Sequence, residues 1–309
     1  MKTGCLLLSA CLELGMFTFA AAQAPNATDT PGKPQTQTLD LTPDPAGKLS
    51  QQQMQNLFRV VAEKDLENDK RLRDYTYSER EVETKVDGTG QPKSSEVKTY
   101  DILEIYGEQV QRLTAKDDKP LPEKEAAKEE EKIQKIIDKR KNESENDRKK
   151  RQEKEEKERE QEREFVKDVA DAYDFTLVGS ESLAGRDNWV IDGEPRAGFV
   201  PHAKDAKYLA KFHGRAWIDK TDLQLAKLDV ECLDTISWGV FLARFHKGSR
   251  FMFEQTRVNN EVWLPLHVTA KVDARLALLK SVDVNVEQSY SDYKKFRATA
   301  RIIGAGDAK

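Results

Sequence analysis

Residues 261–273 read EVWLPLHVTAKVD and alternate between apolar and mostly polar side chains. The apolar set is Val262, Leu264, Leu266, Val268, Ala270 and Val272. A period of two predicts a β-strand with one apolar face. Residues 281–289 repeat the pattern, with valines at 282, 284 and 286. A sheet of such strands must cover its apolar face with helices, another sheet or a ligand.

Further segments of the same kind predict a large antiparallel sheet. They are residues 75–86, 96–106, 108–114, 175–178, 188–192, 208–219, 223–233 and 250–258. Asp87-Gly88 is a hairpin turn signal between the first two. An open sheet of about ten strands tends to curl. We therefore expect an α+β fold, with a curved antiparallel sheet (a half-barrel), an amino-terminal helix and a long charged helical insertion.

The amino terminus predicts export. Lys2 precedes an apolar stretch from 6 to 22 that ends in Ala20-Ala21-Ala22-Gln23, a pattern typical of a cleaved signal peptide. A periplasmic protein is therefore expected. Leu8-Ser9-Ala10-Cys11 resembles a lipoprotein cleavage site, so an outer-membrane lipoprotein anchored at Cys11 is the alternative. Cleavage after Ala22 would leave Cys232 alone and exclude an intrachain disulfide.

Composition divides the rest of the chain. Residues 23–48, rich in Pro, Thr, Gln and Asp, predict a disordered linker. Residues 49–121 hold a helix capped by Ser50 and the first strands. Residues 122–172 form the charged insertion, residues 173–298 the remaining antiparallel meander, and residues 299–309 a tail.

The charged insertion predicts solvated helix, because Glu and Lys recur three and four residues apart. Its apolar residues gather near its two ends, so we expect anchored ends and a projecting middle; whether it is one helix or a hairpin is open. A solvated spacer is favoured over a partner surface.

The order of elements resembles a known family. A leader, a helix, three strands, a helical excursion and a meander look like the lipoprotein-carrier half-barrel of the bacterial periplasm. Gly214-Arg215-Ala216-Trp217-Ile218-Asp219 and Glu261-Val262-Trp263-Leu264-Pro265 resemble segments of outer-membrane lipoprotein-sorting proteins. The resemblance spans about residues 50–296 and implies a cavity for acyl chains. The charged insertion departs from it, because the carrier's corresponding helices are short and form a lid.

The apolar faces of these strands must also be covered by other side chains or by a ligand, independently of the resemblance. The ligand-cavity candidates are Tyr208, Phe212, Ile218, Phe251, Phe253, Leu264, Leu266, Val284 and Val286. Trp238, Phe241 and Phe245 are lid candidates, because their spacing fits a short amphipathic helix. Ordinary core packing remains the alternative for both groups.

Catalytic and nucleic-acid functions find little support. The four histidines lack ligand spacing, Cys232 sits on an apolar strand face, and 51 basic against 55 acidic residues show no basic excess. We expect no catalytic residue, metal or cofactor. The sequence favours a monomeric, non-enzymatic binding protein for an apolar ligand or lipoprotein acyl chain. The alternative is an interaction or stress-sensing module that contacts an envelope protein through its charged arm.

Overall fold

The computed structural model describes residues 39–45, 48–106, 108–238, 243–276 and 280–296. The predicted signal peptide (1–22), most of the predicted linker (23–48), the lid candidate Phe241 and the predicted tail (299–309) lie outside the described residues. Where the linker is described, its end is not a free tether, because Leu39 and Leu41 pack against the core.

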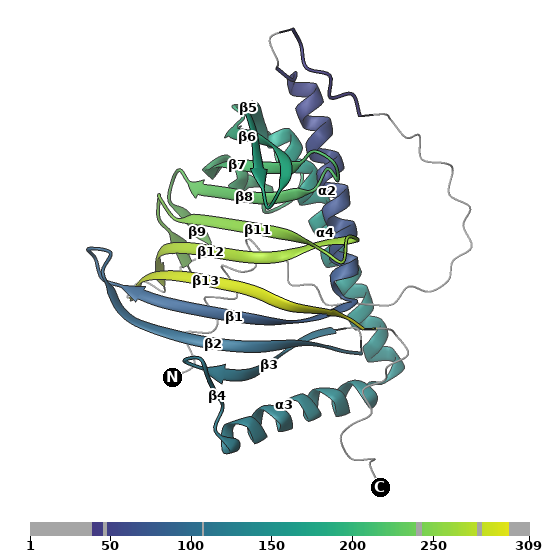
Figure 1. Ribbon diagram of the computed structural model, residues 1–309, viewed down its shortest axis with the longest axis vertical. Coiled ribbons are helices and arrows are strands. Elements are labelled where there is room, and N and C mark those ends of the chain that lie inside the picture. Colours follow the sequence, from purple (N-terminus) through teal and green to yellow (C-terminus); the bar gives the residue numbers. More distant parts are fainter. Residues whose placement is uncertain (1–38, 46–47, 107, 239–242, 277–279, 297–309) are drawn as a thin grey trace.

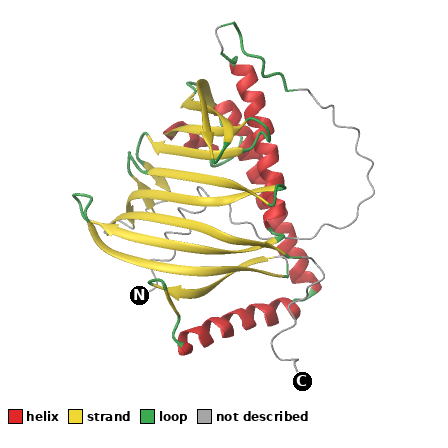
Figure 2. Ribbon diagram, viewed as in Figure 1, coloured by secondary structure: helices red, strands yellow, loops and turns green. Residues whose placement is uncertain are grey.

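A single antiparallel sheet dominates the described chain (Figures 1 and 2). Its strands follow the order β4-β3-β2-β1-β13-β12-β11-β8-β7-β6-β5, so the first long strand pairs with the last. Both ends of this order stay unpaired with each other, and the sheet is open, as expected of a half-barrel. The bounds are β1 Tyr75–Val86, β2 Pro92–Ile105, β3 Glu108–Lys116, β4 Lys119–Pro120, β5 Tyr173–Leu183, β6 Arg186–Pro195, β7 Phe212–Asp219, β8 Leu225–Cys232, β11 Arg250–Val258, β12 Val262–Leu276 and β13 Lys280–Lys295. A small hairpin, β9 Ile236–Trp238 and β10 Ala243–Phe245, pairs with β12.

Helix α2 (Gln51–Leu72) runs across the strand ends on one side of the sheet (Figure 1). Ser50 and Gln53 form a capping box at its start, which satisfies backbone donors that a helix leaves free. Met54, Leu57 and Val61 are buried and pack against Ile218 and Ala216 of β7. We call this face of the sheet the inner face, and the opposite face the outer face.

The charged insertion forms two helices, α3 (Glu123–Lys141) and α4 (Glu145–Ala172). Helix α4 rises beside α2, and its end is anchored because Phe165 and Val169 pack on the core (Figure 1).

Helix α3 contains the apolar residues near the first end of the insertion and lies along β3. Leu113 N–H donates to Glu129 Oε2 at 3.4 Å, and Lys132 Nζ donates to the Gln111 carbonyl at 3.3 Å. Ile133 is only 4% exposed. Because β4 pairs with just the end of β3, α3 supplies partners to backbone groups that a strand near a sheet edge would leave open.

Two local predictions are wrong. Tyr208 lies in the 3-10 helix η1 (Ala206–Lys211) and not in a strand, because Ala206 and Leu209, three residues apart, bury one face of that turn. Trp238 and Phe245 belong to β9 and β10 and not to an amphipathic helix. Phe245 pairs with Ala274 of β12, so strand pairing replaces helical spacing.

Candidate functional site

The end of the inner face beneath α2 is filled. Ile218 is fully buried there, among α2 side chains and residues of β5, β6 and η1. Phe58 of α2 stacks on Phe175 of β5 with ring centroids 4.0 Å apart. Ile218 is therefore a core residue and not part of a hollow, which corrects its place among the cavity candidates.

Beyond α2, apolar side chains follow one another across the inner face. Val230, Phe251, Ala270 and Val286 are direct cross-strand partners on β8, β11, β12 and β13. Directly paired residues point to the same face of a sheet. We call this set the apolar row. Phe251 is half-buried, unlike Ile218, and so keeps surface that another group can cover.

A second line of paired residues runs parallel to the apolar row. Leu228, Phe253 and Val268 are partners across β8, β11 and β12. Leu228 also packs against the core under α2, which places both lines on the inner face. Phe253 is half-buried, whereas Val268 is 2% exposed.

Both lines end in polar residues at β1. Val286 pairs with Glu83, and Gln288, the partner of Val268, pairs with Glu81. Gln288 Nε2 donates to Glu79 Oε1 at 3.0 Å and to Glu81 Oε2 at 3.1 Å. Burial, aided by the charge of Glu81, raises the pKa of Glu79 to about 7, against a weaker hydrogen bond from Gln111. Along these two lines the inner face is thus apolar on β8, β11 and β12, carries both Val286 and the polar Gln288 on β13, and is titratable at β1.

The remaining cavity candidates divide among separate places. Val284 and Val286 form a cluster with Val272, against which Phe245 and Ala270 pack. Leu264 belongs to another cluster, with Tyr75 and Val262. Phe212 is half-buried on β7 opposite Cys232.

Leu266 does not join the buried row that its spacing predicted. It is 43% exposed. The register of β11 and β12 shifts here, since Glu254 pairs with His267 and Gln255 with Pro265. Leu266 is the extra residue of this β-bulge, and a bulge re-aims the side chain that it inserts.

Of the three lid candidates, only Phe245 has a described side chain. Phe245 is half-buried and packs on the cluster of Val272. Trp238 lies in β9, but its side chain is outside the described part of the structure, as is the whole of Phe241.

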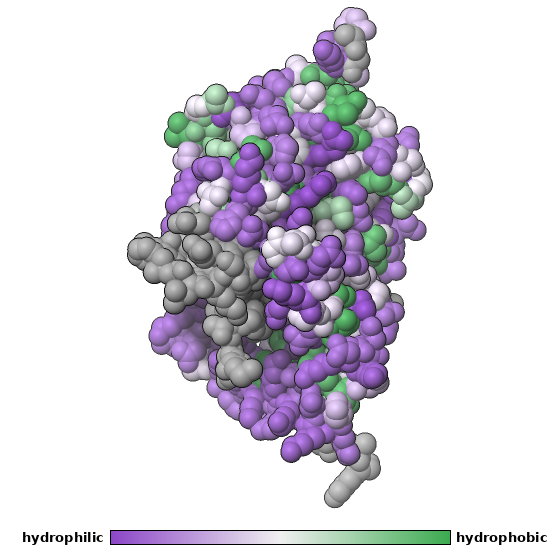
Figure 3. Space-filling model, turned by 90° about the vertical axis from the view of Figure 1, so that its left-hand side faces the viewer, coloured by the Kyte–Doolittle hydropathy of each residue, from purple (hydrophilic) through white to green (hydrophobic). Residues whose placement is uncertain are grey.

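The outer face carries a groove that sequence reasoning missed. Its volume is about 430 Å³. It is lined mainly by Val82, Thr84, Asp229, Arg250, Met252, Thr269, Lys271, Asn285 and Glu287, and its lining also includes Ala270 and Val286 of the apolar row. Arg250 pairs with Asp229, and on neighbouring strands Arg215 pairs with Asp192. Seen from the left of Figure 1, the visible described surface is mostly hydrophilic with small separate apolar patches (Figure 3).

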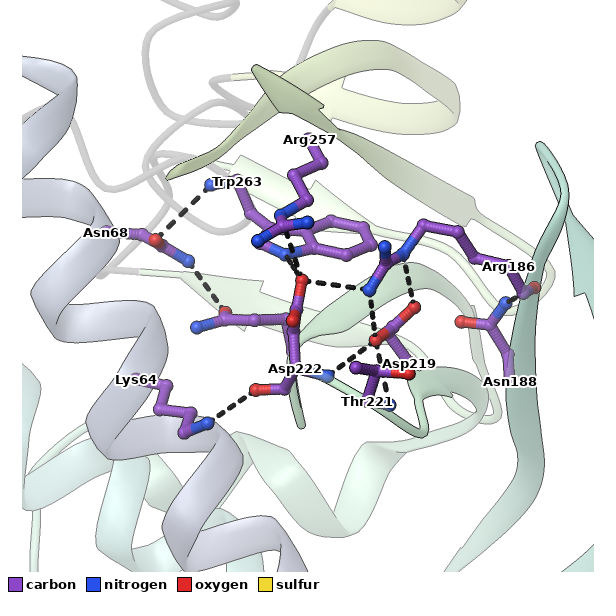
Figure 4. A network of polar contacts seen from close by, with 10 residues as sticks. Lys64, Asn68, Arg186, Asn188, Asp219, Thr221, Asp222, Arg257 and Trp263 are labelled. Atoms are coloured by element: carbon purple, nitrogen blue, oxygen red, sulfur yellow. Dashed lines mark hydrogen bonds and ion pairs between the residues drawn. The ribbon is translucent and has the colours of Figure 1, made fainter. Parts of the chain in front are cut away.

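A buried polar network at α2 was also missed (Figure 4). Asp219 is fully buried and binds Arg186 through both carboxylate oxygens. Burial alone would raise the pKa of Asp219, but hydrogen bonds from Arg186 and from the backbone N–H of Asp222 hold it below its ordinary value. Asp222 in turn accepts from Arg186 and from Trp263 Nε1. The only sequence signal was the turn at Thr221-Asp222, because the partners come from distant strands.

In the described residues, the histidines and Cys232 do not form a metal-binding or catalytic group. No group of three His, Cys, Asp or Glu side chains there is arranged to hold a metal ion. His202 Nδ1 lies 2.7 Å from Oδ1 of the buried Asp168, whose Oδ2 accepts from the backbone N–H groups of His202 and Ala203. Cys232 is fully buried, and burial raises the pKa of its thiol, which disfavours the reactive thiolate. Within the described chain, no helix has the length and apolar content to cross a bilayer.

Comparison with known proteins gives distant structural likenesses. No protein-family model matches the chain, and a search of curated proteins finds no match. A DUF1329 family protein from Desulfovibrio piger is 10% identical, with 80% of this chain and 95% of that one covered and a TM-score of 0.27. An outer membrane lipoprotein-sorting protein domain from Vibrio parahaemolyticus is 12% identical, with coverage of 78% and 95% and a TM-score of 0.29. A LolA superfamily protein from Nitrosomonas europaea is 11% identical, with coverage of 77% and 94% and a TM-score of 0.28.

The last two names are those of the family that the sequence resembles. Their TM-scores are low, so no ligand and no residue role is transferred from them to this chain.

Proposed function

We propose that the chain is an exported, monomeric, non-enzymatic carrier that holds an acyl chain or another apolar ligand against the inner face of its sheet. The observation that supports this most is the apolar row: four paired strands present Val230, Phe251, Ala270 and Val286 side by side. Burying apolar surface stabilises a complex by about 25 cal/mol per Å². Phe251 in this row is half-buried, so a ligand chain can bury the part of its ring that stays exposed.

The helices account for only part of the inner face. Helix α2 contacts β5 and β12, and α4 contacts α2 and η1. Their apolar residues gather in the core around Ile218. The apolar row lies on β8, β11, β12 and β13, farther along the sheet than Ile218 of β7. Phe251 of this row is two residues along β11 from Phe253, which belongs to the second line. A ligand chain lying along the row would cross β8, β11, β12 and β13.

The outer groove is the rival site for an apolar ligand. Its volume of about 430 Å³ is large enough for a ligand chain. However, it is flanked by charged side chains, including Asp229, Arg250 and Lys271. Burying such groups against an acyl chain costs free energy, whereas the inner row presents hydrocarbon alone.

The charged arm favours the carrier over an interaction module. On α4, Lys149 pairs with Glu153, Lys154 with Glu158, and Arg163 with Glu156. These charges are satisfied within one helix, which is the pattern of a solvated spacer. Export to the periplasm is part of the proposal, with anchoring at Cys11 as its variant.

Binding of a fluorescent fatty acid, with two neighbouring substitutions, tests the proposal. Phe251 faces inward and Met252 faces outward, and both are half-buried. We expect Phe251→Gln to weaken binding about tenfold or more and Met252→Gln to leave it near the wild-type value. Absence of binding by the wild-type protein overturns the proposal, and loss of binding only in Met252→Gln moves the site to the outer groove.

A further inference from the structure

A second, polar hollow lies between α2 and the strand ends that carry the buried polar network. Its volume is about 240 Å³, below the range of roughly 300 to 1,000 Å³ typical of drug-sized ligands. It is lined by Lys64, Glu67, Asn68, Arg71, Thr221, Asp222, Gln224, Arg257, Glu261 and Trp263. Figure 4 shows Lys64 and Asn68 of α2 facing Asp222, Arg257 and Trp263. A hollow of this size and polarity suits a small charged group.

The acids of this hollow already have partners. Asp222 Oδ2 lies 2.9 Å from Arg186 Nη2 and 3.1 Å from Arg257 Nε. It also accepts from Trp263 Nε1 at 3.0 Å. Arg186 and Arg257 together therefore balance the charges of Asp222 and the buried Asp219.

Glu261 is balanced in the same way. Its Oε1 accepts from Lys295 Nζ at 2.7 Å and from the Tyr75 hydroxyl at 2.5 Å. These hydrogen bonds hold the pKa of Glu261 below its ordinary value, so the carboxylate stays ionised and engaged.

Two cations of the hollow bind neutral groups instead. Lys64 Nζ donates to the Asp222 carbonyl at 2.5 Å, and Arg71 Nη1 donates to the Glu261 carbonyl at 2.8 Å. Among the described residues, neither forms an ion pair, although the charge of Arg71 also contributes to the lowered pKa of Glu261. They are seven residues apart on α2, which places them on one face of the helix about 10 Å apart along its axis. A guanidinium has five donor hydrogens, so Arg71 keeps donors for another acceptor.

The charges that remain favour an anion. The two positive charges of Lys64 and Arg71 exceed the one negative charge of the exposed Glu67, which lies between them on α2. Arg257 adds donors at the strand side of the hollow. Arginine and lysine together are the usual partners of phosphate and carboxylate oxygens, with arginine able to bind two oxygens at once.

We propose that this hollow is a binding site for a small oxyanion, a phosphate or carboxylate group, held by Lys64 and Arg71 of α2 with Arg257 opposite. The inference does not depend on an apolar ligand, because the site and the apolar row share no residue. The phosphate group has two possible sources, a free anion or the headgroup of an anionic lipid.

Titration calorimetry with inorganic phosphate tests the site, at low ionic strength and with the chloride concentration matched. We expect saturable binding to the wild-type protein, weakened at least about tenfold in Arg71→Gln and in Lys64→Gln, because hydrogen bonds to charged groups contribute most to such affinity. Lys70→Gln is the matched control, with the same charge change on the neighbouring exposed residue. We expect it to bind like the wild type.

The outcomes are decisive in each case. Equal weakening in Lys70→Gln would show an effect of net charge alone and overturn the site, as would absence of phosphate binding by the wild type. Thermal melts confirm folding, and Lys64→Gln carries the test if Arg71→Gln is unstable.

Vesicle binding then separates the two sources of the phosphate group. If a lipid is the source, phosphatidylglycerol vesicles bind the wild type, Arg71→Gln reduces that binding, and phosphatidylcholine vesicles bind neither protein. If the free anion is the source, phosphate binds and neither kind of vesicle does.

Discussion

Arg186 and Asp219 form a two-point ion pair inside the sheet, with Nε to Oδ2 at 2.6 Å and Nη2 to Oδ1 at 2.8 Å. The Asp219 side chain is 1% exposed. Removing one partner of such a pair leaves an uncompensated buried charge, which costs about 3 to 5 kcal/mol. We therefore expect Arg186→Met to lower the free energy of unfolding by about 3 kcal/mol in urea denaturation.

The control for this prediction is Arg215→Met. Arg215 pairs with Asp192 in the same two-point geometry, but on the outer face with both side chains at least a third exposed. Exposed pairs contribute about 0 to 1 kcal/mol. Equal losses in the two variants would contradict the special role of the buried pair.

Glu79 should make the stability of the protein depend on pH. Its pKa rises from an ordinary 4.5 to about 7, so the folded state binds this proton more tightly than the unfolded state does. The stabilisation is complete below pH 4.5 and is lost as pH rises through 7. The difference between the two pKa values corresponds to about 3 kcal/mol of stability.

We expect Glu79→Gln to flatten this fall in urea denaturation series between pH 5 and pH 8 and to raise stability at pH 8. Some slope will remain, because burial also raises the pKa of Glu81. Glu67→Gln, at an exposed position on α2, should keep the wild-type slope. An unchanged slope in Glu79→Gln would show that Glu79 is ionised in the folded protein near pH 5.

Ile133 should anchor α3 to the sheet. It is 4% exposed, while Ile136 of the same helix is half-buried. Truncation of a buried isoleucine to alanine costs about 2 to 5 kcal/mol. We expect a loss near 2 kcal/mol for Ile133→Ala and a smaller loss for Ile136→Ala, measured by chemical denaturation. If Ile133→Ala costs nothing, α3 does not pack on β3, and the alternative of a detached interaction arm gains support.

Elements with local signals were predictable. The alternation of residues 75–86 and 250–258 matches β1 and β11 at both ends, and the Ser50 cap marks the start of α2. Alternation and capping depend on residues a few positions apart, so a single sequence contains them. The same alternation predicted that Phe251 and Phe253 share one strand face, and in β11 they are two residues apart with partners on one face of β12.

Features set by distant residues were not predictable. The pairing of β1 with β13 joins the two ends of the described sheet sequence. The bulge that leaves Leu266 unpaired and exposed depends on the register of β11 against β12, which the sequence of β12 alone does not contain. The network of Arg186, Asp219 and Asp222 likewise gathers side chains that are unremarkable in their own segments.

Photo-crosslinking with a diazirine-bearing fatty acid tests the central claim, that an apolar ligand lies along the inner face, most directly. After irradiation, mass spectrometry of peptides locates the modified residues. The account predicts labels on Val230 or Phe251, which belong to the apolar row and do not line the outer groove, and their loss when unlabelled fatty acid competes. Labels confined to Met252, Thr269 and Lys271 of the outer groove, or labelling that no competitor removes, would contradict it.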